Sequence, residues 1–261
     1  MKESLVEHAS NIQALFINIK WRKPTSRIIA KNKIETKSMQ DAKNQGIDMA
    51  QFSQLDLPKK LLSNGIVFIW STKDMLSHII EIMEKWQFSY IENICVCMLH
   101  LPENDEIDPI ESHESPHKKL KVDECSSRTT AENASWQKNK QNFMENLATH
   151  KEIPQNLFIN HDRRYLKCTK KVLLMFRRNV DKSQLELRHQ RNPDALFDIV
   201  NPDSVDELED TTMNKIYDTI ETLLPKTKIY HSEETEPKYK MIELFANKEK
   251  PRKNWIQICQ K

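Results

Sequence analysis

Basic side chains gather on both sides of a short apolar run in the second half of the chain. The run is Val172 to Phe176, and Tyr165 precedes it. Lysine and arginine neutralise phosphates and an aromatic ring can stack on a base, so this composition predicts nucleic-acid binding that weakens as salt rises. Solvated strand ends would carry the same residues, and that interpretation stays open. The basic residues are Arg163, Arg164, Lys167, Lys170, Lys171, Arg177 and Arg178.

A second candidate site lies near the start of the chain, where an apolar run gives way to polar residues. The stretch ALFINIKW is apolar up to Ile17 and then breaks into Asn18, Ile19, Lys20 and Trp21. An amide and an aromatic directly after an apolar strand suggest that the strand ends at a site. Lys20 would bring a positive charge into that site. A strand-end aromatic that only packs is the alternative for Trp21.

Composition excludes several other kinds of site. The sequence has only 2 glycines, so it lacks the glycine-rich phosphate loops of kinases, NTPases and dinucleotide-dependent dehydrogenases. Lys+Arg 40 against Asp+Glu 38 gives a net charge of +2, so any charged partner must be met by local patches. The cysteines lack the paired spacing of zinc sites, which predicts no metal site and a reducing compartment. They are Cys95, Cys97, Cys125, Cys168 and Cys259.

An α/β fold is predicted to position these residues, because short continuous apolar runs alternate with amphipathic segments. Strands are predicted at 12–19, 66–70, 90–99, 172–176, 241–245 and 255–259, and helices over 76–86 and from Thr211 or Thr212 to Pro225. The strand, helix and strand over 66–99 predict a parallel βαβ unit. Residues 22–52 are predicted to form a polar loop, and Gly65 to close a short helix in the left-handed conformation.

We predict a single domain over residues 1–261, interrupted by two polar insertions. Residues 102–160 nearly lack aliphatic clusters, so they are predicted to form a surface loop with a short helix near 141–147. His113, His117 and Cys125 are interpreted as solvated loop residues within it. A second, acidic loop is predicted at about 203–210. Apolar runs fall far short of the ~20 residues that cross a membrane, so no membrane partner is predicted.

Three stretches together resemble the MT-A family of N6-adenine methyltransferases, which act on adenine in messenger RNA or DNA. They are LPKKLLSNGIVFIWSTKDMLSHIIEIMEKWQF, KIYDTIETLLP and IELFANKEKPRKNWIQI, in the family's order and at about its spacing once the insertions are removed. The resemblance implies a Rossmann-like class I methyltransferase fold with a permuted motif order and a mainly parallel central sheet flanked by helices. In that order the target-base motif lies near the N-terminus and much of the cofactor site near the C-terminus.

The family's catalytic motif is Asp-Pro-Pro-Trp at a strand end, and it falls on Asn18, Ile19, Lys20 and Trp21. Adenine's exocyclic amine is a poor nucleophile, so it needs a side-chain oxygen and a main-chain carbonyl as acceptors while positive charge develops on nitrogen. An amide oxygen can still accept, as in the Asn-Pro-Pro-Tyr of related bacterial enzymes. However, losing both prolines restores backbone donors and freedom, and a Lys20 ammonium would oppose the developing charge. No catalytic residue is predicted.

The cofactor half of the resemblance is degenerate as well. After IELF the family has Gly-Arg-Pro-His-Asn, and this chain adds a Cβ at the glycine and lacks the guanidinium. The family's Asn-Gln pair, which holds S-adenosylmethionine, is also replaced, while Lys170 matches its cofactor-contacting lysine. No cofactor site is therefore predicted in this chain. The replaced positions are Ala246, Asn247, Lys248, Glu249 and Lys250 in the first motif, and Gln260 and Lys261 in the second.

The resemblance thus implies a non-catalytic subunit that pairs with a catalytic paralogue carrying intact Asp-Pro-Pro-Trp. S-adenosylmethionine would bind the partner, and this chain would support its fold and nucleic-acid binding. The Lys/Asn/Ile-rich composition and long insertions are most similar to the degenerate subunit of the ciliate DNA adenine methyltransferase complex, which implies DNA, a nuclear location and additional DNA-binding subunits. Two alternatives stay open: an active enzyme with an atypical motif, and the equivalent subunit of an RNA adenine methyltransferase.

Overall fold

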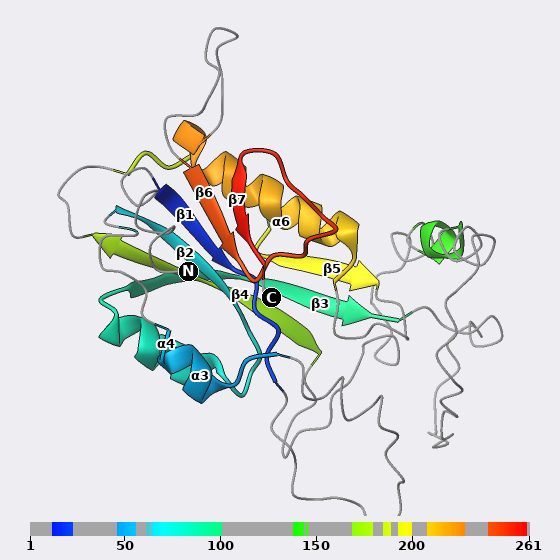
Figure 1. Ribbon diagram of the computed structural model, residues 1–261. Helices are drawn as coiled ribbons and strands as arrows, with labels where there is room; N and C mark the ends of the chain where they lie inside the picture. Colours follow the sequence, from blue (N-terminus) through cyan, green and yellow to red (C-terminus); the bar gives the residue numbers. More distant parts are fainter. Residues whose placement is uncertain are drawn as a thin grey trace, which may run out of the picture. The chain divides into compact units, whose positions relative to one another are not determined.

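A seven-stranded sheet organises the part of the chain that the computed structural model describes (Figure 1). Its order is β5-β3-β4-β2-β1-β6-β7. The strands are β1 (Ile12–Ile17), β2 (Asn64–Ser71), β3 (Ser89–Leu99), β4 (Lys170–Asn179), β5 (Ala195–Ile199), β6 (Lys240–Leu244) and β7 (Trp255–Ile258). All the predicted strands are confirmed within a few residues, whereas β5 was not predicted.

The description covers residues 12–22, 46–55, 62, 64–100, 138–143, 145, 169–179, 185–188, 193–199, 208–227 and 240–259. Predictions for Arg163, Arg164, Lys167, Gln260, Lys261 and most of residues 102–160 and 203–207 lie outside it. The chain divides into two compact units, residues 1–95, 171–195 and 215–261 in one and residues 96–170 and 196–214 in the other. The sites discussed below belong mainly to the first unit.

The strands β2, β1, β6 and β7 form a parallel block, with Ala14 of β1 opposite Ile66 of β2 and Met241 of β6. Strand β4 runs antiparallel to β2, with Leu173 opposite Trp70, and it lies between β2 and β3. The strands of the predicted βαβ unit are therefore separated by another strand. A mixed, mostly parallel sheet in an α/β fold is confirmed.

Helices flank the sheet on both faces (Figure 1). On β1, Leu15 and Ile17 belong to the apolar cluster that includes Ile79 of helix α4 (Leu76–Lys85). Between them, the ring of Phe16 lies 5.6 Å from the ring of Tyr217 of helix α6 (Asp210–Leu223). Because successive strand side chains point to opposite faces, β1 is buried on both sides, as its continuous apolar run predicts.

The predicted polar loop over 22–52 contains a short helix, α3 (Met49–Ser53). Asp48 and Gln51 form a capping box, in which Gln51 N donates to Asp48 Oδ1 at 2.8 Å and Asp48 N donates to Gln51 Oε1 at 3.1 Å. The buried apolar residue of the helix is Phe52. The helix has too few residues for an apolar period to appear in the sequence.

Helix α6 begins at Asp210, before the predicted cap at Thr211 or Thr212. Its first turn is held by Asp198, a buried residue of β5. Asp198 accepts from Glu209 N at 2.9 Å and from Thr212 Oγ1 at 2.7 Å. The carboxylate of Asp198, from the preceding strand, therefore caps the N-terminus of α6 in place of a side chain at the N-cap position. The predicted stop at Pro225 is confirmed, because α6 ends at Leu223 and Pro225 starts a 3-10 turn, η4 (Pro225–Thr227).

Part of the predicted insertion is helical, at residues 138–143 and 145. Phe143 is buried there, and Lys140 Nζ lies 3.0 Å from Glu209 Oε2. The short helix predicted near 141–147 is thus present over its described residues and starts earlier. No helix of the described residues is long and apolar enough to cross a membrane.

Gly65 lies inside strand β2, so the prediction that it closes a helix in the left-handed conformation is wrong. Glycine is required at this position because there is no room for a side chain. A Cβ at this position would lie 2.5 Å from the carbonyl oxygen of Gln13 and 2.5 Å from Leu62 Cδ1. The backbone of a neighbouring strand cannot move away cheaply.

We therefore expect Gly65→Ala to lower the free energy of unfolding by roughly 2 kcal/mol, the usual cost of overpacking. The thermal midpoint of unfolding, followed by circular dichroism, measures it. Ser89→Ala, at the exposed start of β3, is the matched control and should leave the midpoint unchanged. A Gly65→Ala midpoint equal to that of the control would contradict this packing.

Candidate functional site at the carboxyl ends of β1 and β6

The strand order reverses between β1 and β6. From β1 the chain continues to β2 on one side, and from β6 it continues to β7 on the other. Open α/β sheets bind ligands at such a switch point, outside the carboxyl ends of the strands. Asn18, directly after β1, donates its backbone N–H to Leu244 O of β6 at 3.0 Å. The two predicted motif regions, at opposite ends of the sequence, therefore meet at one place.

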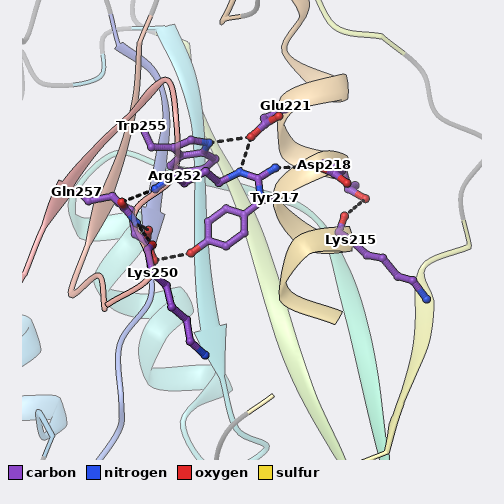
Figure 2. A network of polar contacts seen from close by, with 10 residues as sticks. Lys215, Tyr217, Asp218, Glu221, Lys250, Arg252, Trp255 and Gln257 are labelled. Atoms are coloured by element: carbon purple, nitrogen blue, oxygen red, sulfur yellow. Dashed lines mark hydrogen bonds and ion pairs between the residues drawn. The ribbon is translucent and has the colours of Figure 1, made fainter. Parts of the chain in front are cut away.

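A buried carboxylate, Glu243 of β6, lies at the centre of this place. It is 0 % exposed and accepts three hydrogen bonds. Asn18 Nδ2 donates to Oε1 at 2.9 Å, Tyr217 Oη donates to Oε1 at 2.8 Å, and Gln257 Nε2 donates to Oε2 at 2.7 Å. Figure 2 shows Tyr217 and Gln257 approaching from α6 and β7. Within the described residues Glu243 makes no ion pair, so neutral donors alone stabilise its buried oxygens.

Arg252 extends this network from the segment between β6 and β7 to helix α6 (Figure 2). Its Nε donates to Glu221 Oε1 and its Nη2 donates to Asp218 Oδ1, both at 2.6 Å. The guanidinium also lies 4.6 Å from the centre of the Tyr217 ring. Burial lowers the pKa of Arg252, but the hydrogen bonds to both carboxylates outweigh burial, so the pKa is raised.

Tyr217 is held in its neutral form. Burial raises the pKa of its hydroxyl above the ordinary value, and the charge of Glu243 and the hydrogen bond to it raise the pKa further. Since the folded pKa exceeds the unfolded one, the stability that this hydroxyl contributes is complete below about pH 10 and is lost as the pH rises further. Tyr217 is therefore a hydrogen-bond donor here and not an acid or base at neutral pH.

The residues after Asn18 are engaged in packing. Ile19 is buried in the apolar cluster. Trp21 donates its indole N–H to Trp70 O at 2.7 Å and lies edge-on to Phe52, with the ring centres 5.2 Å apart. Lys20 is exposed, and its carbonyl oxygen accepts from Ile47 N at 3.0 Å. This arrangement matches the packed strand-end aromatic proposed as the alternative for Trp21.

The positions after β6 are arranged as a turn. Phe245 has φ 64°, a left-handed conformation that is strained for a bulky residue. Ala246 is buried and donates its N–H to Ile258 O at 3.1 Å. Asn247 accepts from Glu249 N at 3.0 Å through its side chain, and Lys248 follows it on the exposed surface.

The described members of the basic set lie at opposite ends of β4. Lys170 and Lys171 precede Val172, which is opposite Ser71 at the carboxyl end of β2, whereas Arg177 and Arg178 lie opposite Ile66 and Gly65 near its amino end. Lys170 and Arg178 are eight residues apart along the strand, a separation of roughly 26 Å, so the set does not form one cluster.

Arg178 is only 3 % exposed. Its guanidinium donates to Trp86 O and lies 4.1 Å from the centre of the Phe88 ring. Burial lowers the pKa of Arg178. This side chain therefore packs in the core and does not present its charge to a phosphate. For Lys170, Lys171 and Arg177, contact with nucleic acid stays a prediction.

Sequence reasoning missed the residues at the centre of the network. Glu243 is a single acidic residue in an apolar strand, and this conflict between residue type and burial was the available signal. Tyr217 lies within the helix predicted up to Pro225, but no polar partner was predicted for it. No group of His, Cys, Asp or Glu among the described residues could hold a metal ion. No known family model matches the sequence, and no curated protein matches it significantly.

Proposed function

We propose that this chain is a non-catalytic, methyltransferase-like subunit. It would pair with a catalytic N6-adenine methyltransferase of the MT-A type and support that partner's fold and nucleic-acid binding. The observation that carries the proposal is the meeting of the two degenerate motifs at the switch point of the sheet. There, the side chain of Asn18 is bonded to Glu243 of the same chain, at 2.9 Å.

The sheet supports a Rossmann-like methyltransferase fold in permuted order. A doubly wound sheet binds its ligand where the strand order reverses, and here this point lies between β1 and β6. The resemblance assigns the target-base motif to the end of β1 and the cofactor loop to the end of β6. The permuted order of motifs along the chain and the arrangement in space are therefore consistent.

The groups that the resemblance assigns to the base side are held by contacts within this chain. Base-side chemistry needs acceptors aimed at the amine. Asn18 donates its side-chain N–H to Glu243, which fixes the orientation of its amide, and the carbonyl of Lys20 accepts from Ile47 N. The ring of Trp21 packs against Phe52. These contacts support a scaffold that has kept the shape of the fold without the chemistry.

DNA is the proposed substrate of the complex, in the nucleus, with further DNA-binding subunits. This part of the proposal rests on the resemblance and the composition. RNA as the substrate, or an active enzyme with an atypical motif, are the competing proposals. Recovery of an Asp-Pro-Pro-Trp protein when the tagged chain is purified from its own cells, together with N6-methyladenine formation on DNA but not RNA, would separate them.

The isolated chain should bind S-adenosylmethionine no better than weakly. Ala246 adds a Cβ where the family has glycine, and Asn247 replaces an arginine. Isothermal titration calorimetry on the pure chain is the measurement, with a catalytic paralogue as the positive control. A micromolar dissociation constant for the isolated chain would favour the active-enzyme alternative.

Rebuilding the catalytic motif should not create an enzyme. Asn18→Asp would place a second carboxylate beside Glu243, where an amide now donates at 2.9 Å. Like charges this close repel strongly, so we expect a loss of stability in addition to inactivity. The triple variant Asn18→Asp, Ile19→Pro and Lys20→Pro is assayed for methyl transfer to adenine-containing DNA and RNA.

The same assay on the pair gives the control. Removing the aspartate of the partner's Asp-Pro-Pro-Trp should abolish methylation, whereas Lys20→Ala in this chain should change it little. Methyl transfer by the triple variant alone, or full activity of the partner without this chain, would refute the proposed function.

A further inference from the structure

The segment between β6 and β7, residues 245–254, is an unusual connection between parallel strands. Trp255 of β7 pairs with Met241 of β6, so the segment returns from the carboxyl end of β6 to the level of its second residue. That return covers about 10 Å along the strand direction. No helix lies in the fully described stretch between Leu244 and Trp255, although parallel neighbours are usually connected by one. We call residues 245–254 the crossover segment.

Side chains fix the crossover segment in place. Arg252 joins it to Asp218 and Glu221 of α6, and Trp255 Nε1 donates to Glu221 Oε1 at 2.9 Å. Gln257 binds the backbone of the segment from β7. Its Oε1 accepts from Arg252 N at 2.8 Å, and its Nε2 is 3.3 Å from Lys250 O. These contacts within the chain fix the conformation of the segment.

Three exposed lysines project from this fixed backbone: Lys248, Lys250 and Lys253. The charge of Arg252 is offset by two carboxylates, and Glu249 is the acidic residue within the segment. In Figure 2 the Lys250 side chain extends away from the polar network. From Ala246 to Asn254 the segment carries no exposed large apolar side chain.

We propose that the crossover segment is a nucleic-acid phosphate-binding surface, with Lys248, Lys250 and Lys253 as the contacts and Arg252 as the positioning residue. Nucleic-acid backbones are bound mainly by lysine and arginine, whereas the cores of protein interfaces are depleted in lysine and enriched in aromatic residues. Lysines on a segment that is fixed by side-chain contacts and carries no exposed large apolar side chain fit the first class of partner. The choice of nucleic acid as the ligand rests on the proposed function, but binding to this surface does not require a catalytic partner.

The test compares two triple variants for binding to a fluorescent DNA duplex by anisotropy across a range of salt concentrations. Lys248→Ala, Lys250→Ala and Lys253→Ala together should weaken binding roughly tenfold or more near 0.1 M salt. The slope of log affinity against log salt should fall by about 0.9 for each phosphate that is no longer neutralised. The control removes three other exposed lysines, through Lys73→Ala, Lys85→Ala and Lys138→Ala, and should change both quantities much less. Equal effects in the two variants would overturn the proposal.

Arg252→Met tests the positioning role. The variant keeps all three lysines but removes the hydrogen bonds to Asp218 and Glu221 of α6. We therefore expect weaker DNA binding with an unchanged slope of log affinity against log salt. A salt slope reduced to that of the lysine variant would instead make Arg252 a phosphate-binding residue and overturn its positioning role. Binding of the lysine triple variant to polyglutamate is measured as well. If the three substitutions weaken binding to polyglutamate but not to DNA, the partner is an acidic protein and the proposal fails. None of these outcomes depends on S-adenosylmethionine or on a paralogue, so failure here is distinct from failure of the proposed function.

Discussion

Replacing Glu243 by alanine should lower the free energy of unfolding by about 3 kcal/mol or more. The change leaves three half-buried donors without their acceptor, those of Asn18, Tyr217 and Gln257. Each unsatisfied buried polar group costs about 1–3 kcal/mol, and the missing side chain adds a cavity. Urea denaturation followed by tryptophan fluorescence measures the change.

Two further variants sharpen this test. Glu243→Gln keeps the side-chain shape but places an amide N–H donor opposite the Nε2 donor of Gln257. Gln257 could accept from the new amide only if its side-chain oxygen turned away from Arg252 N, so we expect an intermediate loss of stability. Glu84→Ala, on the exposed side of α4, should change stability by less than about 0.5 kcal/mol. A Glu243→Ala protein as stable as Glu84→Ala would show that the carboxylate is not enclosed in this network.

Truncating Arg178 to alanine should cost about 3 kcal/mol, a larger loss than at any other basic position described here. Its guanidinium is buried, donates to Trp86 O and covers the ring of Phe88, so truncation removes packing as well as a hydrogen bond. The same urea experiment applies. Lys170→Ala, at the exposed start of β4, is the matched control and should be nearly neutral.

Nucleic-acid binding separates the two roles of these basic residues. If Arg178 serves the fold, the folded fraction of Arg178→Ala should bind DNA like the wild type at low temperature, with an unchanged salt slope. A stable Arg178→Ala protein with weakened DNA binding would show that Arg178 contacts nucleic acid.

Most strand and helix positions could be predicted from the local pattern of apolar residues. Continuous apolar runs such as Ile66 to Trp70 identified buried strands. In the predicted helix, Ile216 and Ile220 are four residues apart, and both are buried in α6. Helix α3 and the start of α6 could not be found in this way. The first is too short to show a period, and the second is held by Asp198, whose position in space no local sequence reveals.

The sequence by itself determined that Asn18 to Trp21 contain neither an acidic residue nor a proline, because this is a matter of residue identity. It also determined an α/β fold, since apolar periodicity is a local property. Only the tertiary structure decided that Asn18 and Glu243 meet, that Arg178 is buried and that Arg252 holds the crossover segment. Contacts between residues far apart in the chain depend on strand order and register, which hydrophobic pattern does not encode.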